Sequence, residues 1–175
     1  MDNVLELEIR RKIYTLILEN PGLHAKKIAD ILSLQGQLAD YHLAYLERAE
    51  IVTTVKEEGN RRYYATGKLG MTERRRISIL RKEIPLRIIL YLLQYPYSTH
   101  KEILEQLEIV KSTLSYHITK LLNYGLIRVH AQDKGKTYTV VNEKEIITLL
   151  IKYKPYRRMD SFKETWLDLK WPGVP

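Results

Sequence analysis

The stretch that decides the fold is Val110–Leu126, which reads Val-Lys-Ser-Thr-Leu-Ser-Tyr-His-Ile-Thr-Lys-Leu-Leu-Asn-Tyr-Gly-Leu. Its apolar residues recur at the spacing of one helix face: Leu114, Ile118, Leu121 and Leu122. Gly125 stands where a helix commonly ends in the left-handed conformation. The opposite face carries polar residues with a single cation among them: Ser112, Tyr116, Thr119, Lys120 and Asn123. Such a face suits base edges and phosphates, although an ordinary surface helix is also amphipathic.

The elements predicted before and after this helix indicate which fold it belongs to. Upstream, Thr99–Leu107 opens with the capping-box pattern Thr-x-x-Glu and predicts a short helix. Downstream, Ile127–Ala131 and Thr137–Val141 are β-prone runs, joined by a tip that contains Lys134 and Lys136. A helix, a tight turn, a polar-faced helix and a basic hairpin follow one another in the order of a winged helix-turn-helix.

The amino-acid sequence of this stretch also resembles that of a known family. Lys-Ser-Thr-Leu-Ser-Tyr-His-Ile at 111–118, with Leu-Leu-Asn-Tyr-Gly-Leu-Ile at 121–127, resembles the recognition helix and its exit in the ArsR/MarR-like superfamily of prokaryotic transcription regulators. The resemblance implies a helix that enters the major groove and a wing that touches the backbone. The DNA-binding residues expected in this half are Lys111, Ser112, Thr113, Ser115, Tyr116, Thr119, Lys120, Lys134 and Lys136.

Composition sets the broad class of the protein. A chain of 175 residues with 45% hydrophobic content suits one or two small domains. No apolar run approaches the roughly 20 residues needed to cross a bilayer, so we expect a cytoplasmic protein with no membrane partner. The absence of cysteine excludes disulfides and thiolate metal sites. The formal charge of +8 favours a polyanionic partner.

The first half repeats the second. Helices are expected at Val4–Glu19, His24–Leu32 and Gln37–Ala49, and strands at Ile51–Lys56 and Arg62–Ala65. A shift of 75 positions aligns the two halves without gaps and matches Ile13 with Ile88, Pro21 with Pro96, Tyr41-His42 with Tyr116-His117, and Tyr63 with Tyr138. The shared Pro and Tyr-His positions favour a tandem duplication over a chance match of apolar residues.

We therefore predict a mainly α fold with small β-hairpin wings: two tandem winged helix-turn-helix domains joined by a helical linker. The expected boundaries are 1–66, a basic linker at 67–83, 84–154, and a C-terminal tail at 155–175 with a short amphipathic helix at Ser161–Lys170. This tandem arrangement resembles transcription regulators of archaea.

The two copies differ in the chemistry of their candidate recognition helices. In the first copy, Asp40 and Glu47 flank the outward face, and carboxylates beside a phosphate backbone are unfavourable. We expect the second copy to be the main base reader, and the first to contact the backbone through its wing or to serve pairing. The additional DNA-binding candidates are Gln37, Tyr41, Arg61, Arg62 and the linker residues Arg74, Arg75 and Arg76.

The sequence gives little support for a catalytic site or a metal site. The five histidines lack acidic or thiolate neighbours at ligand spacing, and His42 and His117 are expected to form structural hydrogen bonds. No phosphate loop, nucleophile elbow or pair of catalytic carboxylates is present, so we expect neither an enzyme nor a cofactor.

The sequence predicts a sequence-specific double-stranded DNA-binding transcription regulator. The alternative is a winged-helix interaction module that scaffolds a complex and reads little DNA, which the acidic first copy favours. A second copy of the chain and the transcription machinery stay open as further partners, and Trp166 in the tail is expected to dock on its own domain or on such a partner.

Overall fold

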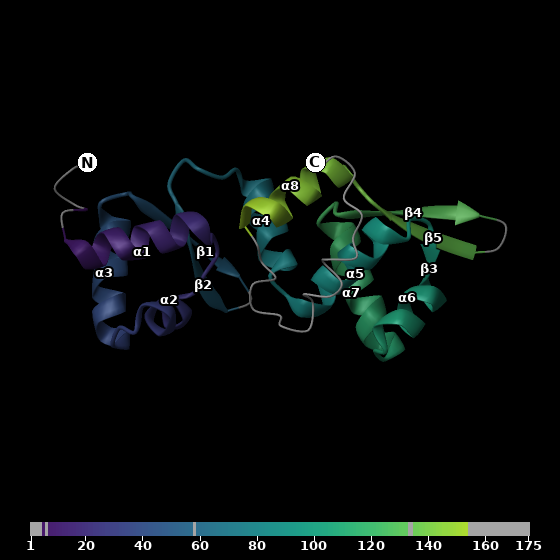
Figure 1. Ribbon diagram of the computed structural model, residues 1–175, viewed down its shortest axis with the longest axis horizontal. Coiled ribbons are helices and arrows are strands. Elements are labelled where there is room, and N and C mark those ends of the chain that lie inside the picture. The colour runs from purple at the N-terminus through teal and green to yellow at the C-terminus, as the bar shows by residue number, and fades with distance from the viewer. Residues whose placement is uncertain (1–4, 6, 58, 133–134, 154–175) are drawn as a thin grey trace. The chain divides into compact units, whose positions relative to one another are not determined.

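A computed structural model describes residue 5 and residues 7–57, 59–132 and 135–153 (Figure 1). The expected tail helix at Ser161–Lys170 lies outside these residues. The chain divides into two compact units, and the boundary falls between Ile77 and Ser78. Among the described helices, none is sufficiently long and apolar to span a lipid bilayer.

The first unit packs three helices against a two-stranded hairpin. Its elements are α1 (Glu8–Glu19), α2 (Ala25–Leu32), α3 (Gly36–Arg48), β1 (Val52–Glu57) and β2 (Asn60–Ala65), followed by α4 (Met71–Leu80), which contains the boundary. The helical spacing of apolar residues brings Ile13, Ile17, Ile28, Leu43 and Leu46 together in a core from which water is excluded. Tyr63 and Val52 close this core from the hairpin.

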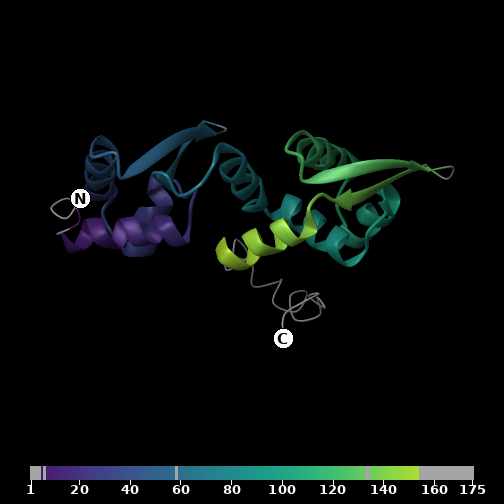
Figure 2. The same ribbon diagram turned by 90° about the horizontal axis from the view of Figure 1, so that it is seen from above.

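The second unit has the same architecture with one more strand. It consists of α5 (Glu83–Gln94), β3 (Ser98–Thr99), α6 (His100–Leu107), α7 (Lys111–Asn123), β4 (Ile127–Gln132), β5 (Gly135–Val140) and α8 (Glu143–Tyr153). The strands form an antiparallel sheet in the order β3-β5-β4. Both views show β4 and β5 running side by side past the helices of their unit (Figure 2).

The 75-residue repeat holds element by element. Each of α1, α2, α3, β1 and β2 has a counterpart in α5, α6, α7, β4 and β5 that begins and ends 75 positions later. The bridge between Leu23 and Tyr63 recurs as the pairing of Ser98 with Tyr138. Even the left-handed turn residue after the second helix recurs, as Ser33 with φ 53° and Glu108 with φ 51°. The expected fold class, tandem winged helix-turn-helix domains, is confirmed.

The helix ends follow the sequence signals closely in the second unit. Thr99 and Glu102 form the predicted capping box, in which the Thr99 N–H donates to Glu102 Oε2 at 2.7 Å and the Glu102 N–H donates to Thr99 Oγ1 at 3.3 Å. Gly125 adopts φ 62°, as expected for the end of the recognition helix. Val110 caps α7 without a side-chain hydrogen bond, as does Gln35 before α3.

Some boundaries differ from the prediction. The first helix begins at Glu8 rather than Val4. Helix α4 begins at Met71, inside the linker predicted at 67–83, and the Glu73 carboxylate accepts a hydrogen bond from the Gly70 N–H at 3.0 Å. This carboxylate satisfies one of the amides that every helix leaves free at its beginning.

Candidate nucleic-acid interface

One face of helix α7 is buried in the core of the second unit, and the opposite face is exposed to solvent. Leu114, Ile118 and Leu121 are buried, at most 4% exposed, and anchor the helix in the core of the second unit. Since these positions lie on one side of a helix, the polar residues between them point outward. The structure places Lys111, Ser112, Ser115, Tyr116 and Thr119 at the exposed surface, with Thr113 and Lys120 half-buried. The predicted base-reading residues therefore share one face.

Tyr116 stands at the centre of this face. Its ring is 55% exposed and meets the ring of His117 edge-on, with the centroids 5.0 Å apart and the planes at 75°. Lys120 Nζ lies 4.8 Å from the Tyr116 ring centroid. An ammonium group at this distance is attracted to the face of the ring. The exposed tyrosine ring therefore contacts two neighbours on its own helix.

Sequence reasoning missed His100, the first residue of α6. Its Nε2 lies 3.1 Å from Ser115 Oγ, so the start of α6 contacts the recognition helix α7. Burial, and then the positive charge of Lys111, lower the pKa of His100 below its ordinary value. The imidazole therefore favours its neutral form beside Ser115. In the sequence, only the position of His100 in the first turn of the helix that precedes α7 pointed to this contact with Ser115.

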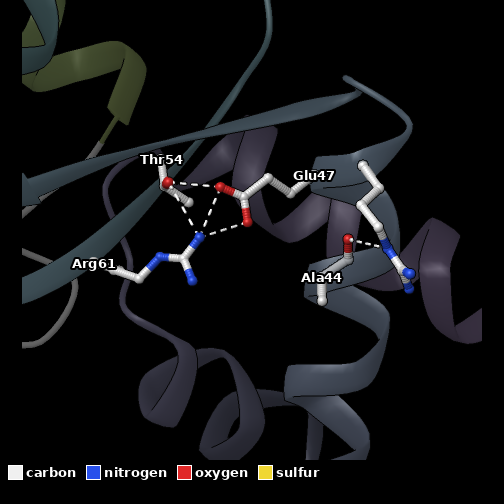
Figure 3. Close-up of polar contacts among 5 residues, drawn as sticks. Ala44, Glu47, Thr54 and Arg61 are labelled. Atoms are coloured by element: carbon white, nitrogen blue, oxygen red, sulfur yellow. Dashed lines mark hydrogen bonds and ion pairs between the residues drawn. The ribbon is translucent and has the colours of Figure 1, made fainter.

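The two wings differ in how their cations are held. Lys136 lies exposed on β5, opposite Ala131 on β4. Lys134 lies outside the described residues. At the position equivalent to Lys136, the first unit has Arg61, and its Nη2 lies 2.7 and 2.6 Å from the two carboxylate oxygens of Glu47 on α3 (Figure 3). The first wing is therefore tied to its own recognition helix.

Thr54 on β1 completes this cluster. Its hydroxyl donates to Glu47 Oε1 at 2.7 Å, so the same carboxylate accepts from both strands of the hairpin (Figure 3). Partial burial acts to raise the pKa of Glu47, but the hydrogen bonds from Thr54 and Arg61 outweigh it and lower the pKa. The hydrogen bond to Glu47 in turn raises the pKa of Arg61. Glu47 therefore favours its ionised form, in which it accepts hydrogen bonds from Thr54 and Arg61.

The remaining basic candidates lie in different surroundings. Arg62 Nη1 donates to the Gly22 carbonyl at 3.1 Å, and its Nε lies 3.6 Å from Glu57 Oε2. Arg74 Nε donates to the Leu69 carbonyl at 3.1 Å, and its guanidinium lies 5.2 Å from the Tyr64 ring centroid. Arg76 is half-buried and Arg75 is exposed. Of the three linker arginines, Arg75 is therefore the one best exposed to solvent.

The equivalent face of the first unit is less polar. Gln37 and Tyr41 are exposed, as expected, and Tyr41 is 55% exposed like its counterpart Tyr116. Beside them, Leu38 is 38% exposed, and Ala44 and Asp40 also face solvent. This mixture lacks the row of hydroxyl groups that α7 presents.

The histidines show no metal site within the residues that the structure describes, where no three His, Asp or Glu side chains gather at ligand spacing. The hydrogen bond predicted for His42 is not found: its Nδ1 has no hydrogen-bond partner among the described residues. Instead its ring meets Tyr41 edge-on, with centroids 5.1 Å apart and planes at 70°. Burial, and then the charge of Arg10, lower the pKa of His42.

Comparisons with known proteins agree with this architecture. Residues 7–77 match a family model described as an N-terminal HTH domain, and residues 81–128 match one described as winged helix-turn-helix DNA-binding. An HTH-type transcriptional regulator of Methanocaldococcus jannaschii is 32% identical over 139 residues, which cover 79% of this chain and 35% of that protein. The chain therefore spans about a third of the length of this relative.

Solved structures with some similarity have low overall scores. A conserved hypothetical protein from Chlorobium tepidum gives a TM-score of 0.33 at 15% identity, over 82% of this chain and 96% of that one. ScpB from Mycobacterium tuberculosis gives 0.32 at 15% identity, over 81% and 94%. These scores support no conclusion about function. The two family models describe a helix-turn-helix and a winged helix-turn-helix DNA-binding domain, in agreement with the architecture of the two units.

Proposed function

We propose that this protein, built of two winged helix-turn-helix units, regulates transcription by sequence-specific binding to double-stranded DNA. In this proposal α7 lies in the major groove, and the wing of β4 and β5 contacts the backbone. The observation that carries the proposal is the exposed face of α7. Its thirteen residues contain hydroxyl, phenol and ammonium groups on the outer side and no carboxylate.

The chemistry of this face suits base reading. The major groove is about 12 Å wide and admits an α-helix, and each base pair presents a distinct pattern of donors and acceptors there. Ser112 offers a short hydroxyl that can donate to or accept from a base edge. Thr119 Oγ1 donates to the Ser115 carbonyl at 2.9 Å and Ser115 Oγ contacts His100, so these two hydroxyls have their remaining hydrogen-bonding capacity for a base edge. Lys111 at the beginning of α7 and Lys136 on the wing supply positive charge for phosphates on either side.

The first unit takes a lesser part in base reading. Arg61 is already bound to Glu47, and Arg62 is bound to the Gly22 carbonyl, so neither is well placed for a new phosphate contact. Arg75 is the cation of the linker that we place on the phosphate backbone, with Arg74 and Arg76 in support. Gln37, in the first turn of α3, retains a role at the edge of the interface.

Two finer assignments belong to the same proposal. The resemblance of α7 to ArsR/MarR-like recognition helices supports membership of that superfamily, and the Methanocaldococcus relative supports an archaeal type. The rival function, a scaffold that reads little DNA, is favoured by one observation only, the apolar and acidic face of α3. Because that face belongs to the first unit, it is compatible with base reading by the second.

The test is selection of bound duplexes from a random library of about 20 base pairs, roughly two helical turns. Enrichment of a defined sequence, bound more tightly than random DNA, is the expected result. Each base contact contributes about 1–3 kcal/mol of discrimination. Equal affinity for selected and random duplexes would leave only non-specific binding, and the proposal of a sequence-specific regulator would then be wrong.

A further inference from the structure

The outer face of α3 differs from that of α7 at most equivalent positions, although Tyr41 and Tyr116 are shared. Leu38 stands where α7 has Thr113, Ala44 where it has Thr119, and Arg48 where it has Asn123. Asp40 replaces Ser115 and is exposed. Where α7 has neutral polar groups, α3 therefore has two apolar residues and two residues of opposite charge. Given that α7 is the base reader proposed above, α3 has a surface that this function does not use.

Both flanks of this face are occupied by contacts within the first unit. On one side the Arg10 guanidinium lies 3.5 Å from the centroid of the Tyr45 ring. On the other side Glu47 is held by Arg61 and Thr54. The charges that border the face are thus satisfied internally. Asp40 and Arg48, in contrast, form no ion pair with any of the described residues, and the Arg48 Nε donates to the carbonyl of Ala44 at 3.3 Å.

We propose that α3 packs antiparallel against α3 of a second copy of the chain, about a two-fold axis that passes close to Ala44. In such a pair, a residue four positions before the axis faces the residue four positions after it on the other copy. At about 1.5 Å per residue, Asp40 and Arg48 lie roughly 6 Å on either side of Ala44. Each Asp40 therefore faces Arg48 of the second copy, and the contact is made twice.

The other residues of the face fit the same arrangement. Helices that cross face to face approach within about 8–10 Å, depending on the side chains at the contact, and Ala44 is small enough for the near end of this range. Tyr41, 55% exposed and about 60° round the helix from Ala44, supplies apolar surface beside the axis. A self-complementary patch of this kind is what an isologous dimer requires.

The charges explain why a second copy fits this face better than DNA does. Asp40 would face phosphates of the same sign, which is unfavourable, whereas in the dimer it meets a guanidinium. Ala44 offers no hydrogen bond to a base edge, but it does allow another helix to approach closely. A two-fold dimer carries two copies of α7, so the target of the proposed regulator should be an inverted repeat.

One helix pair makes a small interface, below the roughly 1,200 Å² of a standard stable complex. We therefore expect a monomer–dimer equilibrium that depends on concentration, measured by sedimentation equilibrium between about 1 µM and 1 mM, the range of weak complexes. Asp40→Arg and Arg48→Asp should each raise the dissociation constant at least about tenfold, because each places like charges opposite one another. The double variant Asp40→Arg/Arg48→Asp should restore dimerisation.

The double variant separates this geometry from a mere change in net charge, since only an Asp40–Arg48 pair between copies is repaired by the exchange. Asp30→Arg is the matched control. Asp30 is exposed on α2 of the same unit, so this variant carries the charge change of Asp40→Arg and should dimerise like the wild type. Circular dichroism should show unchanged helix content in every variant.

A wild-type chain that stays monomeric over the whole range would overturn the proposal, as would single variants that dimerise normally. So would a loss of base discrimination in Asp40→Arg, which would mean that α3 reads DNA. A short duplex with one half-site separates the two proposals. Monomeric variants should still bind it through α7, whereas intact dimerisation without any DNA binding would contradict the proposed function and leave the dimer standing.

Discussion

Arg61 on β2 and Glu47 on α3 form an ion pair in which Nη2 lies 2.7 and 2.6 Å from the two carboxylate oxygens (Figure 3). The equivalent positions of the second unit hold Lys136 and Leu122. The second wing therefore has no acidic partner at that place on its recognition helix. One fold thus supports two electrostatic arrangements: a first wing that is neutralised from within, and a second wing whose cation is exposed.

This difference predicts unequal effects of two matched wing substitutions. Lys136→Ala should make the slope of log affinity against log salt shallower by about 0.9, because one phosphate contact is lost. Arg61→Ala should change the slope very little, since Arg61 is already paired. Fluorescence anisotropy with one labelled duplex over a salt series measures both slopes.

Glu47→Gln provides the control for the wing pair. It removes the acid and leaves Arg61 available, so Arg61→Ala should affect the salt slope in this background although it has little effect in the wild type. Equal slope changes for Arg61→Ala and Lys136→Ala in the wild type would mean that DNA displaces Glu47 and that both wings touch phosphate.

A second matched pair tests which recognition helix reads bases. Tyr116 and Tyr41 are equally exposed, at 55%, and each meets the histidine that follows it edge-on. Tyr116→Ala should reduce the preference for selected over random DNA by about 1–3 kcal/mol, whereas Tyr41→Ala should leave it nearly unchanged. Competition binding with both duplexes gives the ratio directly. Equal losses for the two variants would show that both helices read bases.

The linker should act through charge alone. Arg75 is exposed on α4, and we expect Arg75→Gln to weaken binding to selected and random duplexes by the same factor, because phosphate contacts carry no sequence information. Arg11→Gln, which removes an exposed arginine from α1, is the control and should have a smaller effect. A change in the ratio of the two affinities would instead indicate that Arg75 contacts a base.

The sequence predicted most of the fold because its signals were local and repeated. The apolar spacing of Leu114, Ile118 and Leu121 marked the buried side of α7 correctly. The Pro and Tyr-His matches set the 75-residue register that the elements confirm. With that register, each helix or strand of one copy supported the interpretation of its counterpart in the other.

What the sequence did not predict depends on contacts between distant residues. The strand β3 is only Ser98–Thr99, too short for a period of its own, and it exists because it pairs with β5. The ion pair of Arg61 joins a wing to Glu47, 14 positions away on another element, and no local pattern marks such a partner. The contact of His100 with Ser115 is of the same kind. The sequence could therefore predict which faces are exposed, but it could not predict which partner each charged side chain on them contacts.

The stability of the protein in acid should depend on His100. Burial, and then Lys111, lower the pKa of His100, and burial, and then Arg10, lower that of His42. The unfolded chain takes up protons at these residues below about pH 6.5, the ordinary value for histidine, while the folded chain resists them. Stability should therefore fall as the pH decreases from about 7.5 to about 5.5. His100→Gln should reduce this fall in the free energy of unfolding, measured by urea denaturation at both pH values. Ser115→Ala removes the same hydrogen bond without removing a titrating group, so it should keep the wild-type pH dependence. If His100→Gln loses as much stability on acidification as the wild type does, the shifted proton equilibrium at His100 is not a source of the acid sensitivity.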